Sequence, residues 1–255
     1  MDDLFSLQGK TAVVTGGSRG IGAMIAGGFV RAGVKTIITA RKLEELQHTA
    51  DELNKEGECI PIASDLSTVA GVAAFSEQLK AHVDTLDILI NNAGATWGAP
   101  LADFPEVGWD KTMDLNIKSI FFLTQKLLPL LTAAGSASSP ARVVNIGSIN
   151  GLTHPKMDNY AYSASKAAVH HLTRHLGAEL ASQHVNVNAI APGFFPSKMT
   201  AHLLPHEEEL VTGIPCGRLG NADDAAGTAI YLCSKASNWM VGQTLVLDGG
   251  LVAAS

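Results

Sequence analysis

The sequence is short of cysteine, of positive charge and of signs of export. Its 255 residues hold three cysteines, Cys59, Cys216 and Cys233, which match no metal-ligand spacing. An odd, scattered set of thiols fits a reducing compartment better than a disulfide framework. Lys and Arg total 18 against 24 Asp and Glu, a net charge of -6, and no basic run occurs. The sequence therefore lacks the electrostatic footprint of a nucleic-acid-binding protein.

Long apolar stretches are also missing. No run of about eighteen apolar residues occurs, so no membrane span is predicted. The acidic start at residues 1–5 is a poor signal peptide, which makes the cytoplasm the expected location. The chain is nevertheless 46% hydrophobic and only 16% charged, so it can form a sizeable core.

Short apolar stretches alternate with helical patterns along the chain. Many of these stretches are unbroken by polar residues, as is typical of a parallel sheet buried on both faces. With no linker and no repeat, the pattern predicts an α/β fold: one Rossmann-like domain over residues 1–255, a doubly wound parallel sheet with helices on both faces. Strands are expected at 11–14, 36–40, 59–63, 86–90, 142–146, 185–190 and 244–247. Helices are expected at 21–32, 43–55, 67–83, 107–131, 159–182 and 222–233, with Ser67 as a helix cap and Pro129 as a kink or stop.

A glycine-rich turn joins the first strand to the first helix. Its glycines are spaced Gly16-x-x-x-Gly20-x-Gly22, and Ser18, Arg19 and Ile21 lie between them. Glycines let backbone amides approach a pyrophosphate, and a helix N-terminus supplies partial positive charge. The turn predicts a dinucleotide site; the alternative is a tight turn that needs glycine for its shape alone.

The residue after the second strand bears on the choice of cofactor. An acidic residue there would bind the ribose 2′-hydroxyl of NAD, but this chain has Arg41. Together with Arg19, it predicts a clamp for a 2′-phosphate and favours NADPH over NADH. The alternative is two ordinary surface arginines. After the third strand, Asp65 and Leu66 are expected to flank the adenine ring, although Asp65 fits a helix start equally well.

Tyr162 lies four residues before Lys166 in a predicted helix. Residues at i and i+4 share a face, so the ammonium is expected to favour the phenolate and to lower the pKa of Tyr162 towards neutrality. Tyr160 has Ala164 in the corresponding position and gains no such cation. The alternative for Tyr162 and Lys166 is a pair of surface side chains.

These motifs in this order resemble the short-chain dehydrogenase/reductase family, and the resemblance covers nearly the whole chain. Within that family the chain is most similar to NADPH-dependent 3-oxoacyl reductases, including the rhamnolipid-associated branch. The matching segments are residues 15–22, 65–66, 91–94, 114–116, 148, 162–166, 192–193 and 242–250.

The resemblance implies a catalytic role for four residues. Tyr162 would donate a proton to the substrate carbonyl oxygen, and Lys166 would hydrogen-bond the nicotinamide ribose. Ser148 would hold the carbonyl oxygen; its alternative is a strand-end serine that caps local backbone. Asn116 would hold a water of the proton relay; its alternative is a polar tie in the core.

The resemblance also extends the NADP(H) site. Asn92, Ala93 and Gly94 would close the cofactor pocket, and the segment with Pro192, Gly193, Phe195 and Ser197 would cover the nicotinamide. Ser197 is a departure, because the family often has threonine there. A homotetramer is the family expectation, and no metal is expected.

Residues 194–215 are predicted to form a substrate-side lid. Its apolar side chains favour an apolar or acyl substrate, and the resemblance favours reduction of a 3-oxoacyl thioester to a 3-hydroxyacyl thioester. Two alternatives stay open: a broad-specificity ketone reductase or alcohol dehydrogenase, and a non-catalytic NADPH-binding regulatory protein. The apolar lid residues are Phe194, Phe195, Met199, Leu203, Leu204, Val211 and Ile214.

Overall fold

The computed structural model describes residues 2–155, 157–198, 200 and 207–254. Within this part of the chain, seven parallel strands form one sheet in the order β3-β2-β1-β4-β5-β6-β7. The predicted Rossmann-like fold is therefore confirmed. The strands are β1 (Thr11–Thr15), β2 (Lys35–Ala40), β3 (Cys59–Ala63), β4 (Ile88–Asn91), β5 (Ala141–Ile146), β6 (Val185–Pro192) and β7 (Thr244–Leu247).

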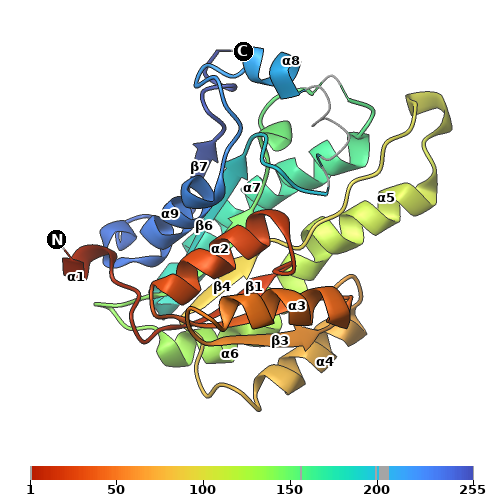
Figure 1. Cartoon of the computed structure of the whole chain (residues 1–255). Coiled ribbons are helices and arrows are strands. Elements are labelled where there is room, and N and C mark those ends of the chain that lie inside the picture. Colours follow the sequence, from red (N-terminus) through yellow and green to blue (C-terminus); the bar gives the residue numbers. More distant parts are fainter. Residues whose placement is uncertain (1, 156, 199, 201–206, 255) are drawn as a thin grey trace.

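Helices cover both faces of the sheet (Figure 1). Successive strand residues point to opposite faces, so Val14 packs in one core with Phe29 of α2, and Val13 packs in another with Phe75 of α4. The α-helices are α1 (Asp2–Phe5), α2 (Gly20–Arg31), α3 (Leu43–Leu53), α4 (Val69–Leu79), α5 (Glu106–Met113), α6 (Ser119–Ala134), α7 (Tyr160–Leu180), α8 (Glu207–Thr212) and α9 (Ala222–Cys233). Shorter turns are the 3₁₀ segments η1 (Leu101–Asp103), η3 (Ile149–Gly151), η4 (Ala181–Gln183) and η6 (Lys235–Ser237), and the π-helical η2 (Asp114–Lys118).

The helix formed by α5, η2 and α6 spans residues 106–134 and is long and apolar enough to cross a membrane by length and composition alone. Core helices of globular proteins meet the same test. Leu123, Leu127 and Leu131 are fully buried in one of the two cores, so we assign this helix to the core.

Some helix limits differ from those expected. Thr68, not Ser67, caps α4, because its hydroxyl accepts the Gly71 N–H. Pro129 does not end α6, which continues to Ala134 because Leu127 and Leu131 anchor it in the core. Within the expected lid, α8 forms a short helix, and Met199, Leu203 and Leu204 lie outside the described residues.

The sheet has its topological switch point between β1 and β4. The chain leaves β1 towards one side of the sheet and β4 towards the other, which opens a crevice at their carboxyl ends. Both the glycine-rich turn and the segment 92–94 begin at this crevice.

Candidate active site

The glycine-rich turn requires glycine at several positions. Gly16 and Gly20 have φ of +66° and +56°, where other residues are strained. A Cβ on Gly22 would overlap the carbonyl oxygen of Gly16. The turn leads into α2, whose N-cap residue Arg19 makes no side-chain capping bond. The first-turn amides of α2 therefore have no cap from the Arg19 side chain, and the binding of an anion there stays a prediction.

A second loop is tied to this turn. The backbone N–H groups of Asn92 and Ala93 each donate to Thr15 Oγ1 at 2.9 Å, and Asn92 Nδ2 donates to the Thr15 carbonyl at 2.8 Å. Thr15 Oγ1 itself donates to the Ile90 carbonyl. These bonds hold the ends of β1 and β4 together and fix the floor of the crevice.

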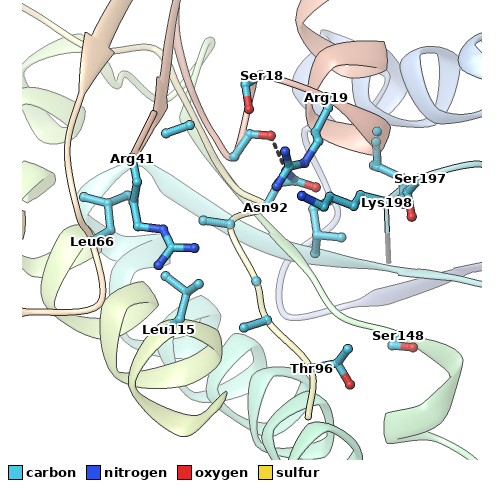
Figure 2. A pocket seen from close by; sticks show the side chains of 18 of the residues that line it. Ser18, Arg19, Arg41, Leu66, Asn92, Thr96, Leu115, Ser148, Ser197 and Lys198 are labelled. Atoms are coloured by element: carbon cyan, nitrogen blue, oxygen red, sulfur yellow. Dashed lines mark hydrogen bonds between the residues drawn. The ribbon is translucent and has the colours of Figure 1, made fainter. Parts of the chain in front are cut away.

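The crevice is a cavity of about 550 Å³, within the range of small-molecule sites. Figure 2 shows Arg41, Leu66 and Leu115 on one side of it, and Arg19, Ser197 and Lys198 on the other. Most of the predicted site residues line it: Gly16, Ser18, Arg19, Gly20, Ile21, Arg41, Asp65, Leu66, Asn92, Ala93, Gly94, Ser148, Tyr162, Lys166, Pro192, Gly193, Phe195 and Ser197. Gly22 and Asn116 are not among the lining residues.

The cavity also has lining residues that the sequence reasoning missed. Lys42 and Glu45 follow Arg41 directly, and Lys198 approaches from the lid. Lys42 and Glu45 are an i,i+3 pair of opposite charge, a signal that the sequence does contain. Leu115 is a further apolar residue on the side of the cavity that also holds Leu66 and Arg41 (Figure 2).

Asp65 already has a structural role. Its Oδ1 accepts hydrogen bonds from the N–H and the hydroxyl of Ser67, at 3.1 and 2.8 Å. The helix-start alternative for Asp65 is therefore present in the structure, and contact with an adenine ring stays a prediction.

Lys166 is buried beneath the cavity floor. It is 4% exposed, and its Nζ donates to the Ile146 carbonyl at 2.6 Å. Burial lowers its pKa to about 8, because desolvation disfavours the ammonium. Nζ lies 5.6 Å from the centroid of the Tyr162 ring, so the two side chains share one face of α7 as expected.

The expected lowering of the Tyr162 pKa is wrong. Burial raises the pKa of Tyr162, and a hydrogen bond with the Ser148 side chain opposes that rise only in part. The Lys166 ammonium is directed to the Ile146 carbonyl instead of the phenol oxygen. The phenol is therefore held in its protonated form, the form that a proton donor needs.

Ser148 fills the backbone-capping role that was its alternative, and its role in holding the substrate oxygen stays a prediction. Its Oγ accepts the Asn150 N–H at 3.1 Å and so caps η3, while the same side chain lines the cavity and bonds to Tyr162. A hydroxyl can accept one hydrogen bond and still donate another. Capping fixes the position of Oγ beside the phenol.

Asn116 acts as a polar tie. It is fully buried; its Oδ1 accepts the Ala95 N–H at 2.8 Å, and its Nδ2 donates to the Ala95 carbonyl and to Ser165 Oγ, each at 2.9 Å. The side chain links the loop after β4 to α7. Its backbone belongs to the π-helical turn η2, a distortion that is frequent at functional sites. The relay-water role stays a prediction.

Ser197 and Thr200 organise the start of the lid. The Ser197 N–H donates to Thr200 Oγ1 at 3.0 Å, and Thr200 Oγ1 donates to the Phe195 carbonyl at 2.6 Å. Phe195 is 3% exposed and packs against Gly220, so it anchors the lid to the core. Ser197 then lies against Gly20 of the glycine-rich turn.

The sequence as a whole matches a known family. The family model of the short chain dehydrogenases covers residues 10–208. The chain belongs to this family. The family resemblance stated from the motifs is thereby confirmed.

Relatives match almost the entire chain. A rhamnolipid-biosynthesis 3-oxoacyl-[acyl-carrier-protein] reductase of Pseudomonas aeruginosa is 47% identical over 253 residues, covering 98% of this chain and 99% of that protein. The solved Pseudomonas aeruginosa RhlG/NADP active-site complex is 46% identical with a TM-score of 0.95, covering 98% and 99% of the two chains. A gluconate 5-dehydrogenase of Burkholderia cenocepacia, solved with NADP and tartrate, is 33% identical with a TM-score of 0.91 over 99% of both chains.

Proposed function

We propose that this protein is an NADPH-dependent reductase that converts a 3-oxoacyl thioester into a 3-hydroxyacyl thioester. One observation carries the proposal: Tyr162 and Ser148 line the same cavity as the glycine-rich turn and the arginine pair. The relative that is 47% identical is named as a 3-oxoacyl-carrier-protein reductase, and the RhlG complex contains NADP.

The residues of the cavity fit NADP(H). The free amides at the start of α2 would bind the pyrophosphate, and Arg41 with Arg19 would bind the 2′-phosphate. Leu66 and Leu115 offer apolar faces for the adenine ring (Figure 2). Lys166 would turn from Ile146 towards the nicotinamide ribose.

The bound cofactor supplies the hydride, and the protein supplies the proton and the orientation. Tyr162 donates its proton to the carbonyl oxygen as negative charge develops there, and Ser148 donates a hydrogen bond to the same oxygen. Because burial raises the pKa of Tyr162, the donor is protonated at neutral pH.

The acyl substrate is proposed from the lid and from the relatives. Phe194 and Val211 are half-buried, Ile214 is buried, and Phe195 is buried but also lines the cavity. Because one relative is a gluconate 5-dehydrogenase, a polar substrate is the alternative to be tested.

A substrate screen that follows NADPH absorbance tests the proposal. Purified protein is given an acetoacetyl thioester, a cyclic ketone, an aromatic ketone and a ketogluconate. A kcat/KM for the thioester at least about tenfold above the others supports the thioester reductase. Equal rates with the simple ketones would identify a broad ketone reductase, and NADPH binding without turnover on any carbonyl would identify a regulatory protein.

We also propose a cytoplasmic homo-oligomer, with the family's tetramer as the expected state. Trp239 is 100% exposed beside the edge strand β7, where Val246 is exposed too. Val107 and Trp109 on α5 and Phe121 on α6 are exposed as well. Such exposed apolar side chains mark interaction surfaces. Light scattering measures the oligomeric state, and a monomer at micromolar concentration would contradict the proposed oligomer.

The three cysteines are free thiols, in keeping with the proposed location in the cytoplasm.

A further inference from the structure

A carboxylate lies among the cations of the cavity. Glu45, in the first turn of α3, places Oε2 2.5 Å from Arg19 Nη1 and Oε1 2.7 Å from Lys42 Nζ. Arg19 belongs to the glycine-rich turn, and Lys42 lies between β2 and α3. Both carboxylate oxygens are therefore occupied by cations that come from two separate loops.

All three residues line the cavity, as do Arg41 and Lys198. The hydrogen bond from Lys42, followed by the charges of Arg19, Lys42 and Lys198, holds the pKa of Glu45 below its ordinary value. Glu45 is thus a permanent negative charge at neutral pH. It stands beside the end of β2, where the adenosine ribose of a dinucleotide lies in this fold.

We propose that Glu45 is an internal counter-ion of the 2′-phosphate subsite and a determinant of cofactor specificity. It forms ion pairs with Arg19 and Lys42 in the free protein, and a 2′-phosphate must compete with it for both. Glu45 therefore lowers the affinity for NADPH and leaves that for NADH almost unchanged. This inference rests on the NADPH part of the proposed function.

The two cofactors differ at the group that Glu45 faces. A 2′-phosphate carries a charge of about -1.5 to -2 at neutral pH and is repelled by a carboxylate. NADH has a neutral 2′-hydroxyl there, and a carboxylate can accept a hydrogen bond from that hydroxyl. The repulsion between Glu45 and the 2′-phosphate therefore offsets part of the attraction that Arg41 and Arg19 provide.

The exposure of the pair limits the size of the effect. The Arg19 and Glu45 side chains are 48% and 37% exposed, so water and salt screen the repulsion. We expect removal of the Glu45 charge to tighten NADPH binding about threefold to tenfold at low ionic strength.

The test measures Kd for NADPH and for NADH by calorimetry on protein without substrate. The variants are Glu45→Gln and, as a matched control, Glu44→Gln. Glu44 is the exposed preceding residue on α3 and lies outside the cavity lining. Each titration is run at low salt and at high salt, and thermal melts check that the variants are folded.

We expect Glu45→Gln to tighten NADPH about threefold to tenfold at low salt and to change NADH less than about twofold. High salt should reduce the gain, and Glu44→Gln should change neither cofactor. An unchanged or weakened NADPH affinity in Glu45→Gln would overturn the inference, and so would equal tightening of NADH. A wild-type protein that prefers NADH would instead refute the proposed cofactor, so the two failures are distinguishable.

Discussion

Replacing Lys166 with methionine should abolish turnover and yet preserve or raise stability near neutral pH. In the folded protein the pKa of Lys166 is about 8, against an ordinary value of 10.5. Because this side chain is buried, the lowered pKa corresponds to a folding cost of about 3 kcal/mol at pH 7. The hydrogen bond to the Ile146 carbonyl, about 2 kcal/mol for a charged donor, is lost with the lysine. Lys166→Met should thus be more stable than wild type by about 1 kcal/mol at pH 7.

The pH dependence of stability distinguishes the cost of burying the Lys166 ammonium from an effect of the methionine side chain on packing. Between pH 8 and pH 10.5 the unfolded chain binds the Lys166 proton more tightly than the folded protein does, so this residue makes the wild type more stable as pH rises. Between pH 7 and pH 9.5 the advantage of Lys166→Met should therefore fall by about 2 kcal/mol.

Urea unfolding of both proteins at several pH values measures this difference. Lys126→Met, which replaces an exposed lysine on α6, is the matched control and should show no such trend, because water solvates its ammonium in both states. A Lys166→Met advantage that does not change between pH 7 and pH 9.5 would refute the assigned cost of burying the ammonium.

Three further changes test other parts of the site. Tyr162→Phe should lower kcat at least about 100-fold, measured by NADPH absorbance, while calorimetry should show that NADPH still binds. Retained turnover would contradict the assignment of Tyr162 as the proton donor. Arg41→Asp should weaken NADPH about tenfold or more and NADH far less, and an equal loss would remove the 2′-phosphate argument. His170→Gln should lower the free energy of unfolding by about 1–3 kcal/mol, because His170 Nε2 lies 3.0 Å from the Ser148 carbonyl. Burial, with the nearby charges of Lys166 and Arg174, lowers the pKa of His170, so wild-type stability should fall as pH drops below 6.5. Urea titrations at pH 5 and pH 7 should show a smaller fall in His170→Gln, and an equal fall would contradict this.

Motif spacing, together with the family resemblance, was sufficient to find most of the residues that line the cavity. Gly16, Gly20 and Arg41 follow strands whose ends meet at one edge of a parallel sheet, so their proximity follows from the fold class. Lys198 was missed because it is distant in the sequence from Arg19 and Arg41. Only the packing of Ser197 against Gly20 brings it to the cavity.

Helix limits were less predictable, because packing overrides local preference. Proline normally interrupts a helix, but Pro129 remains inside α6, where buried leucines precede and follow it. Thr68 and Ser67 are both good caps. The Ser67 hydroxyl donates to Asp65 Oδ1, and the Thr68 hydroxyl caps α4.

The amino-acid sequence by itself determined the fold class, the family and the pairing of Tyr162 with Lys166, since periodicity and spacing are local properties. Only the tertiary structure decided the electrostatics of that pair. Burial raises the pKa of Tyr162 and lowers that of Lys166. The Lys166 ammonium donates its hydrogen bond to the Ile146 carbonyl, whereas the i+4 spacing predicted that it would face the phenol. The tertiary structure likewise placed Glu45 between Arg19 and Lys42, because desolvation and contacts between loops arise only when distant segments pack together.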